Sequence, residues 1–124
     1  MASKISKFET LKMMCHIPAP SGNEVAMKQF ILYYISENSK QWKVKPKVLT
    51  GPEFQDNIIL IFGKPRTAIF AHIDSIGFTV RYGKQLVKIG GPMTKTGYKL
   101  IGSDSKGVQE AELKVVENKK TGTK

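Results

Sequence analysis

The first part of the chain repeats apolar residues with the period of an α-helix. Residues 5–16 place an apolar side chain at every third or fourth position, which predicts an amphipathic helix. Residues 24–37 are apolar over more than one stripe, so we expect a second helix that is largely buried against a sheet. Between them, residues 21–24 have the Ser-x-x-Glu pattern of a capping box, which predicts that Ser21 starts the second helix.

Beyond the second helix the apolar pattern becomes that of β-strands. Residues 42–48 alternate lysines with apolar residues and contain Pro46, a pattern typical of an edge strand. Residues 57–62 and 67–71 are continuous apolar runs between turn residues, and such runs predict strands buried on both faces. A further strand is expected at 76–80. Two-sided strands flanked by helices indicate an α/β fold rather than a sandwich.

The pattern of glycines and apolar residues changes after residue 81. From there on, glycines punctuate short apolar stretches at close spacing, which is typical of a small β-barrel or sandwich. We therefore divide the chain into residues 1–81, an α/β domain, and residues 82–124, the beginning of a β domain.

Candidate chemistry lies where the apolar run 67–71 ends. His72 and Asp74 are two residues apart, so an extended backbone points both side chains to the same face. A neutral imidazole is a good zinc ligand, and a carboxylate on the same face can hold the ring from behind. Open α/β sheets place their ligands at the carboxyl ends of strands. By itself the pair fits a hydrogen-bonded structural histidine as well as a metal site, so the residues around it must decide.

The string from Phe70 to Val80, FAHIDSIGFTV, resembles the first metal-site motif of the glutamyl aminopeptidase and deblocking aminopeptidase family of di-zinc exopeptidases. Three other pieces follow the family's order. Residues 18–24 look like its amino-terminal Ser-Gly-x-Glu segment, and residues 56–60 like the strand with its Gly-Asn step, with Asp56 in place of Gly. Residues 86–92 are similar to the opening of its inserted β domain. The resemblance covers residues 5–92.

The resemblance implies a fold, an activity and a site. The fold would be part of a zinc-peptidase-like sheet flanked by helices, followed by the start of a small inserted β-barrel. His72 would bind zinc, and Asp74 would be the adjacent catalytic-site carboxylate that orients the ligands without binding metal. The enzyme would be an aminopeptidase that removes amino-terminal residues from peptides with two divalent ions, zinc or else cobalt or manganese. Relatives assemble into closed homo-oligomers.

Two departures from the family pattern affect this interpretation. Ser75 stands where the family commonly has Glu, and because that residue is not a metal ligand we expect altered local polarity without loss of the site. The family's bridging Asp, Glu general base, further acidic ligands and second His lie beyond the inserted domain, and this sequence ends at Lys124. We therefore interpret the chain as the amino-terminal portion of such an enzyme. Alone it should be inactive, because catalytic zinc usually needs three protein ligands.

Composition indicates which class of protein and which cellular location to expect. With 40% hydrophobic and 24% charged residues it is typical of a globular domain. No apolar stretch reaches the about 18 residues of a membrane span, and charged residues interrupt any apolar core of a secretory signal. Cys15 is the single cysteine, so we expect a cytoplasmic protein without internal disulfides. The other histidine, His16, is expected to have a structural role at the end of the first helix.

The net charge of +10 introduces a nucleic-acid partner as an alternative. Residues 63–124 carry 12 Lys and Arg against 5 Asp and Glu, but these lysines are scattered along predicted strands instead of clustering, which does not favour nucleic-acid binding. Two alternative functions remain: a basic module that binds nucleic acid or a protein partner, and a non-catalytic relative of the peptidase. Salt-dependent retention on nucleic acid would favour the first. Absence of the bridging Asp and the Glu base from the continuing reading frame would favour the second.

Overall fold

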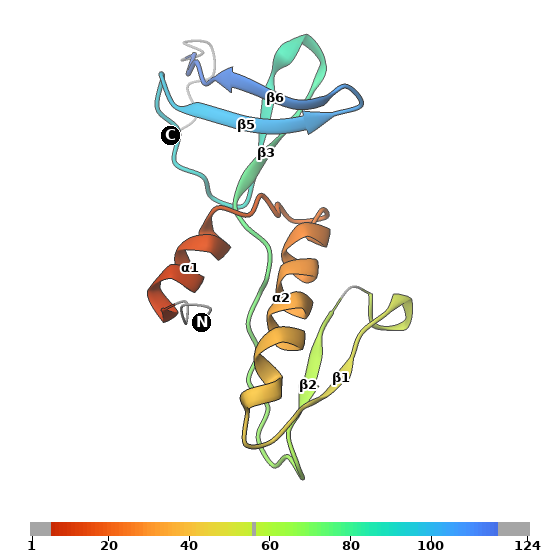
Figure 1. Cartoon of the computed structure of the whole chain (residues 1–124). Coiled ribbons are helices and arrows are strands. Elements are labelled where there is room, and N and C mark those ends of the chain that lie inside the picture. The colour runs from red at the N-terminus through yellow and green to blue at the C-terminus, as the bar shows by residue number, and fades with distance from the viewer. Residues whose placement is uncertain (1–5, 56, 117–124) are drawn as a thin grey trace. The chain divides into compact units, whose positions relative to one another are not determined.

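The computed structural model describes residues 6–55 and 57–116. Within them the chain forms two α-helices and six β-strands, and the strands pair into three separate two-stranded antiparallel sheets (Figure 1). The mixture of helices and strands expected from the sequence is confirmed at this level. The chain divides into two compact units, Met1–Gly90 and Gly91–Lys124. Residue 5 of the first predicted helix, Asp56 and the last eight residues of the predicted second domain lie outside the described residues.

The first helix, α1, spans Lys7–Cys15 as the apolar period predicts. Ser6 caps it: the hydroxyl accepts a hydrogen bond from the Glu9 N–H at 3.1 Å, and the Glu9 carboxylate accepts one from the Ser6 N–H at 2.9 Å. This reciprocal capping box pairs donors that the start of a helix otherwise leaves free. None of the helix residues is buried, so its apolar stripe is exposed to solvent.

The second helix, α2, spans Val25–Asn38 and is followed by a 3-10 turn, η1, at Ser39–Gln41. Its extent confirms the predicted helix. Its predicted burial is wrong, because only Met27 and Ile35 are buried while Tyr33 and its neighbour Tyr34 are exposed. The described residues contain no sheet of more than two strands that could cover the other sides of such a helix.

The strands pair with their neighbours along the chain. The three sheets are β1 (Lys47–Leu49) with β2 (Ile59–Ile61), β3 (Gly77–Val80) with β4 (Leu86–Ile89), and β5 (Lys99–Asp104) with β6 (Gly107–Glu112). Two further 3-10 turns, η2 (Pro52–Phe54) and η3 (Tyr82–Lys84), lie within the first two hairpins. The predicted boundary at residue 81 falls inside the β3–β4 hairpin, whereas the compact units divide after Gly90.

The apolar run 67–71 is not a strand. It is an unpaired, extended segment between β2 and β3, and Ile69 and Phe70 are 93% and 92% exposed (Figure 1). The prediction of a buried strand at this place is therefore wrong, as is that of one larger sheet flanked by helices in the described residues. A strand needs hydrogen bonds to a second backbone, and the apolar pattern indicates a suitable segment without supplying its partner.

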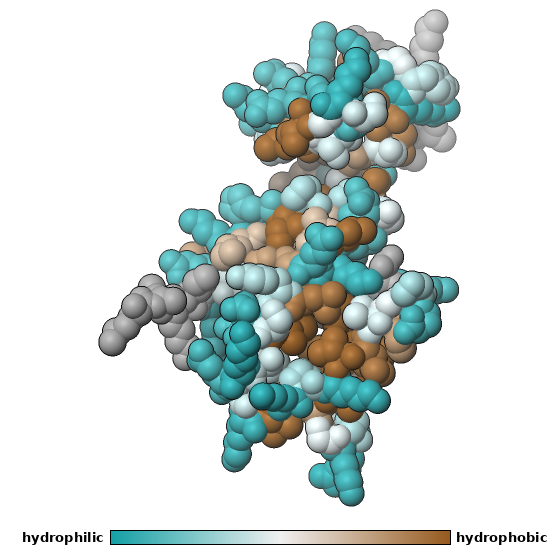
Figure 2. All heavy atoms as spheres, turned by 45° about the vertical axis from the view of Figure 1, so that its right-hand side comes forward, coloured by the Kyte–Doolittle hydropathy of each residue, from teal (hydrophilic) through white to brown (hydrophobic). Residues whose placement is uncertain are grey.

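Burial is limited throughout the described part of the chain. The buried hydrophobic residues are Ala19, Met27 and Ile35 in the first unit and Leu113 in the second. Figure 2 shows hydrophobic side chains gathered in patches on the surface. Among the described helices, none has the length and apolar character needed to cross a membrane.

Candidate functional site

The loop between α1 and α2 holds the segment that carries the candidate site. The Ser75 N–H donates to the carbonyl of Ala19 at 2.7 Å, and the Ala19 N–H donates to the Ser75 hydroxyl at 3.2 Å. Pro20 and Ser75 form an isolated parallel bridge. A Cβ at Gly77 would lie 3.1 Å from the Cβ of Pro20, which is tighter than an ordinary contact, so glycine lets the two segments approach without displacing Pro20. Because Ala19 is buried, this anchor is shielded from competing water.

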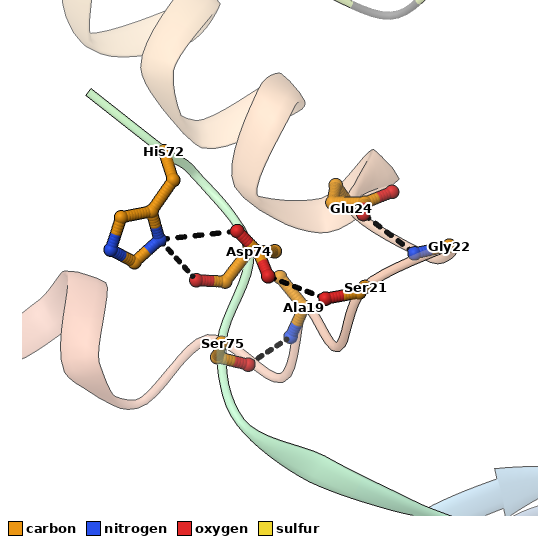
Figure 3. A network of polar contacts seen from close by, with 7 residues as sticks. All are labelled: Ala19, Ser21, Gly22, Glu24, His72, Asp74 and Ser75. Carbon is orange, nitrogen blue, oxygen red and sulfur yellow. Dashed lines mark hydrogen bonds and ion pairs between the residues drawn. The ribbon is translucent and has the colours of Figure 1, made fainter. Parts of the chain in front are cut away.

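The same loop brings Ser21 to Asp74. The Ser21 hydroxyl donates to Oδ2 of Asp74 at 2.5 Å (Figure 3). The predicted capping role of Ser21 is therefore wrong: Glu24 is the N-cap of α2, and no side chain caps that helix. The Glu24 carboxylate instead accepts a hydrogen bond from the Gly22 N–H at 2.6 Å. Since the helix begins only at Val25, the Ser21 hydroxyl lies outside the capping position and is free to bind a charged acceptor.

His72 lies against Asp74 on the other side of the carboxylate. Nδ1 of His72 is 3.1 Å from Oδ1 of Asp74 and 3.0 Å from the Asp74 carbonyl oxygen. Both oxygens are acceptors, so Nδ1 carries the proton and, in the neutral ring, Nε2 keeps its lone pair. Figure 3 shows the second ring nitrogen facing away from Asp74. The expected contact between the two side chains is confirmed, and metal binding by His72 stays a prediction.

The electrostatics of the site follow from these contacts. The hydrogen bond from Ser21 is the main cause that lowers the pKa of the Asp74 carboxyl below its ordinary value; desolvation opposes it, and the neighbouring His72 lowers the pKa further. The carboxylate is thus ionised at neutral pH, as an acceptor for both neighbours must be. Because the folded-state pKa is depressed, its contribution to stability is present above the ordinary pKa and is lost as pH falls through the folded-state pKa.

Replacing Ser21 by alanine is expected to raise the pKa of Asp74 towards its ordinary value, because the variant removes the hydrogen bond that favours the charged form. The measurement is a titration of the Asp74 side-chain carboxyl carbon by 13C NMR in both proteins. The Ser75→Ala variant is the control, because the Ser75 hydroxyl accepts from Ala19 and does not bind the carboxylate. An unchanged titration midpoint in Ser21→Ala would contradict the assigned cause.

The described residues offer one candidate metal ligand at this site, not a complete set. No three His, Cys, Asp or Glu side chains within residues 6–55 and 57–116 are grouped so that they could hold a metal ion. Each carboxylate oxygen of Asp74 is already engaged, Oδ2 by Ser21 and Oδ1 by His72. Nε2 of His72 keeps a lone pair that could bind a metal ion, and the side chain is 85% exposed. One imidazole fits a metal as a single ligand, whereas catalytic zinc usually needs three.

His16 occupies the expected place at the carboxyl end of α1. It is the C-cap residue, and its Nδ1 lies 2.7 Å from the carbonyl oxygen of Lys12, to which it donates a hydrogen bond. The ring is exposed, but it belongs to no metal-binding group among the described residues. These contacts fit the predicted structural role and make His16 a suitable control for His72.

An open recess of about 430 Å³ lies close to the site without including it. Its lining comes from the turn before β2 and from the end of the exposed run: Glu53, Phe54, Gln55, Asn57, Ile58, Ile59, Ile69, Phe70 and Ala71. The lining stops one residue before His72. The recess therefore adds apolar side chains and three polar ones, Glu53, Gln55 and Asn57, near the segment that leads into His72.

Sequence reasoning missed the link between Ser21 and Asp74. The signal was the resemblance of residues 18–24 to a segment of the peptidase family, but the capping pattern explained the same residues locally. No family model matches this chain, and no curated protein matches its sequence. The interpretation of the site therefore rests on its residues and their contacts.

Proposed function

We propose that this chain is the amino-terminal portion of a metal-dependent aminopeptidase that hydrolyses amino-terminal residues from peptides. One observation carries the proposal: Nδ1 of His72 donates to Asp74, and the side chain is exposed with Nε2 turned away. Metal-ligating histidines almost always donate their other ring N–H to a carboxylate, carbonyl or water in this way. His16 is also exposed and donates Nδ1–H, but its acceptor is a backbone carbonyl, so the Asp74 carboxylate distinguishes His72.

The chemistry divides between the metals and the chain. When bound, two divalent ions, zinc or else cobalt or manganese, would activate a water molecule and polarise the peptide carbonyl. His72 would hold one ion through Nε2, and Asp74 would keep the ring in the tautomer that leaves Nε2 free. The remaining ligands and the general base would come from residues outside those described. A cytoplasmic location and assembly into homo-oligomers belong to the same proposal.

Ser75 supports the proposal at the position where the family commonly has Glu. Both of its polar groups are used to anchor the segment: the N–H donates to the Ala19 carbonyl, and the hydroxyl accepts from the Ala19 N–H. The serine therefore stabilises the backbone next to Asp74 and leaves the His72 contact undisturbed. This agrees with the expectation that Ser75 in place of Glu alters local polarity without loss of the site.

The proposal is tested with the protein produced from the complete reading frame. Wild type supplied with zinc, cobalt or manganese is expected to hydrolyse an aminoacyl anilide, and His72→Ala to lose at least about 100-fold in kcat/KM. Changing only the partner behind a metal ligand typically costs 10- to 100-fold, so loss of the ligand itself should cost no less. His16→Ala is the matched control and should keep wild-type activity. The 124-residue chain alone should show no hydrolysis, because its described residues offer one candidate ligand.

Three outcomes would contradict these expectations. No turnover by the complete protein with any of the three metals would favour a non-catalytic relative. Full activity of His72→Ala would remove His72 from the site. Turnover by the 124-residue chain would show that the ligand argument is wrong, since that chain would then have to assemble a complete site.

A further inference from the structure

We infer that Ser21 is a positioning residue for the candidate site: its hydroxyl fixes the Asp74 carboxylate, which fixes the orientation and tautomer of the His72 ring. The inference rests on the proposed function only for its catalytic meaning. The hydrogen-bonded series from Ser21 through Asp74 to His72 is a property of the described residues themselves (Figure 3).

The two carboxylate oxygens of Asp74 have different partners. Oδ2 accepts from the Ser21 hydroxyl at 2.5 Å, and Oδ1 accepts from Nδ1 of His72 at 3.1 Å. A carboxylate held at one oxygen by a charge-assisted hydrogen bond cannot rotate freely, so its other oxygen stays directed at the ring. The Ser21 contact thus restricts rotation of the carboxylate, which would move Oδ1 away from His72.

The need for such a restraint follows from exposure. The side chains of His72 and Asp74 are 85% and 37% exposed, and exposed ion pairs gain little because water competes and both side chains lose freedom. Ser21 reduces that loss, because it sits on a loop already anchored to the site by the paired hydrogen bonds between Ala19 and Ser75. A restraint that is fixed by the fold lets the carboxylate hold the ring in place.

The ring has a second acceptor, which makes the expected effect partial. Nδ1 also lies 3.0 Å from the carbonyl oxygen of Asp74, and that contact does not depend on the carboxylate. Loss of the Ser21 hydroxyl should therefore lower the population of the Nδ1–H tautomer without abolishing it. A purely structural role of Ser21 in the loop would leave the tautomer unchanged.

The test is the tautomer of neutral His72, read from the 15N shifts of Nδ1 and Nε2 in the 124-residue chain above the pH at which the ring titrates. Wild type is expected to show the Nδ1–H form. Ser21→Ala should raise the Nε2–H fraction severalfold, and Ser21→Thr, which restores a hydroxyl, should return it to the wild-type value. His16, whose Nδ1 donates to Lys12, is the internal control and should keep its tautomer in every variant.

Two further variants distinguish a specific effect of Ser21 on Asp74 from a general loss of order in the loop. Ser75→Ala removes one hydrogen bond of the loop anchor but keeps the bond from the Ser75 N–H to the Ala19 carbonyl, so it should shift the His72 tautomer less than Ser21→Ala does. In an Asp74→Ala background, Ser21→Ala should have no additional effect, because the side chain through which it acts is gone. If Ser21→Ala does not fold by circular dichroism, Ser21→Cys replaces it, since a thiol keeps the size and donates weakly. An unchanged tautomer in Ser21→Ala or Ser21→Cys, or an equal shift in Ser75→Ala, overturns the inference.

A separate measurement tests whether Ser21 supports metal binding by His72. In the protein from the complete reading frame, Ser21→Ala should weaken zinc affinity by roughly 10- to 100-fold, as loss of outer support for a ligand typically does, and Ser21→Thr should restore it. If the complete protein has no activity but the tautomer shifts, the proposed function fails and the positioning stands. If His72→Ala abolishes activity while Ser21→Ala leaves the tautomer unchanged, the proposed function stands and the positioning fails.

Discussion

Replacing Ile35 by alanine is expected to lower the free energy of unfolding of the first compact unit by about 2–5 kcal/mol, the usual range for a buried isoleucine. Ile35 lies on α2, is 6% exposed, and is one of three buried hydrophobic residues in the described part of that unit. The substitution removes apolar atoms from water-excluded contacts and leaves a cavity. Because small domains are stable by only about 5–15 kcal/mol, this loss would be a large fraction of the free energy of unfolding.

The measurement is urea denaturation followed by far-UV circular dichroism and Trp42 fluorescence at low protein concentration. Ile69→Ala is the matched control, because it makes the same chemical change at a side chain that is 93% exposed. Its effect should stay within about 0.5 kcal/mol, as for surface substitutions in general. Equal losses in the two variants would mean that α2 does not contribute the core of this unit.

Replacing both Ile69 and Phe70 by lysine is expected to suppress self-association of the chain. These side chains are almost fully exposed and lie in an extended segment that belongs to no strand. An extended apolar segment with free backbone donors and acceptors is a template for pairing with another chain. Lysines at such an edge oppose pairing by charge, as natural edge strands do.

Sedimentation velocity over a range of concentrations provides the test. The wild-type chain should show a mass that increases with concentration, whereas the double variant should remain a monomer. Ile101→Lys with Val108→Lys is the matched control: it adds the same charge at exposed apolar positions whose backbones are already paired between β5 and β6. A wild-type chain that is monomeric throughout, or a control that dissociates equally, would show that the exposed run does not drive association.

The pattern Ser-x-x-Glu shows how far local sequence can predict structure. It occurs at Ser6 to Glu9 and again at Ser21 to Glu24. The first forms a reciprocal capping box at the start of α1, and the second forms none. At the second, the helix begins only at Val25, and the Ser21 hydroxyl binds the carboxylate of Asp74, more than fifty residues away along the chain. No property of residues 21–24 alone indicates that competing acceptor.

The sequence by itself determined the features that depend on near neighbours. The extents of the two helices follow from apolar spacing, and the contact between His72 and Asp74 follows from a separation of two residues on an extended backbone. These local interactions can form whatever tertiary structure the rest of the chain adopts.

Only the tertiary structure decided which distant segments meet. It anchored Ser75 to Ala19, directed Ser21 to Asp74, and left the apolar run 67–71 without a strand partner and exposed. Burial and strand pairing need a second surface or a second backbone, and an apolar pattern records the capacity for such a contact without specifying its partner. For that reason the contact between His72 and Asp74 could be predicted from local spacing, whereas the hydrogen bond from Ser21 to Asp74 became visible only in the folded chain.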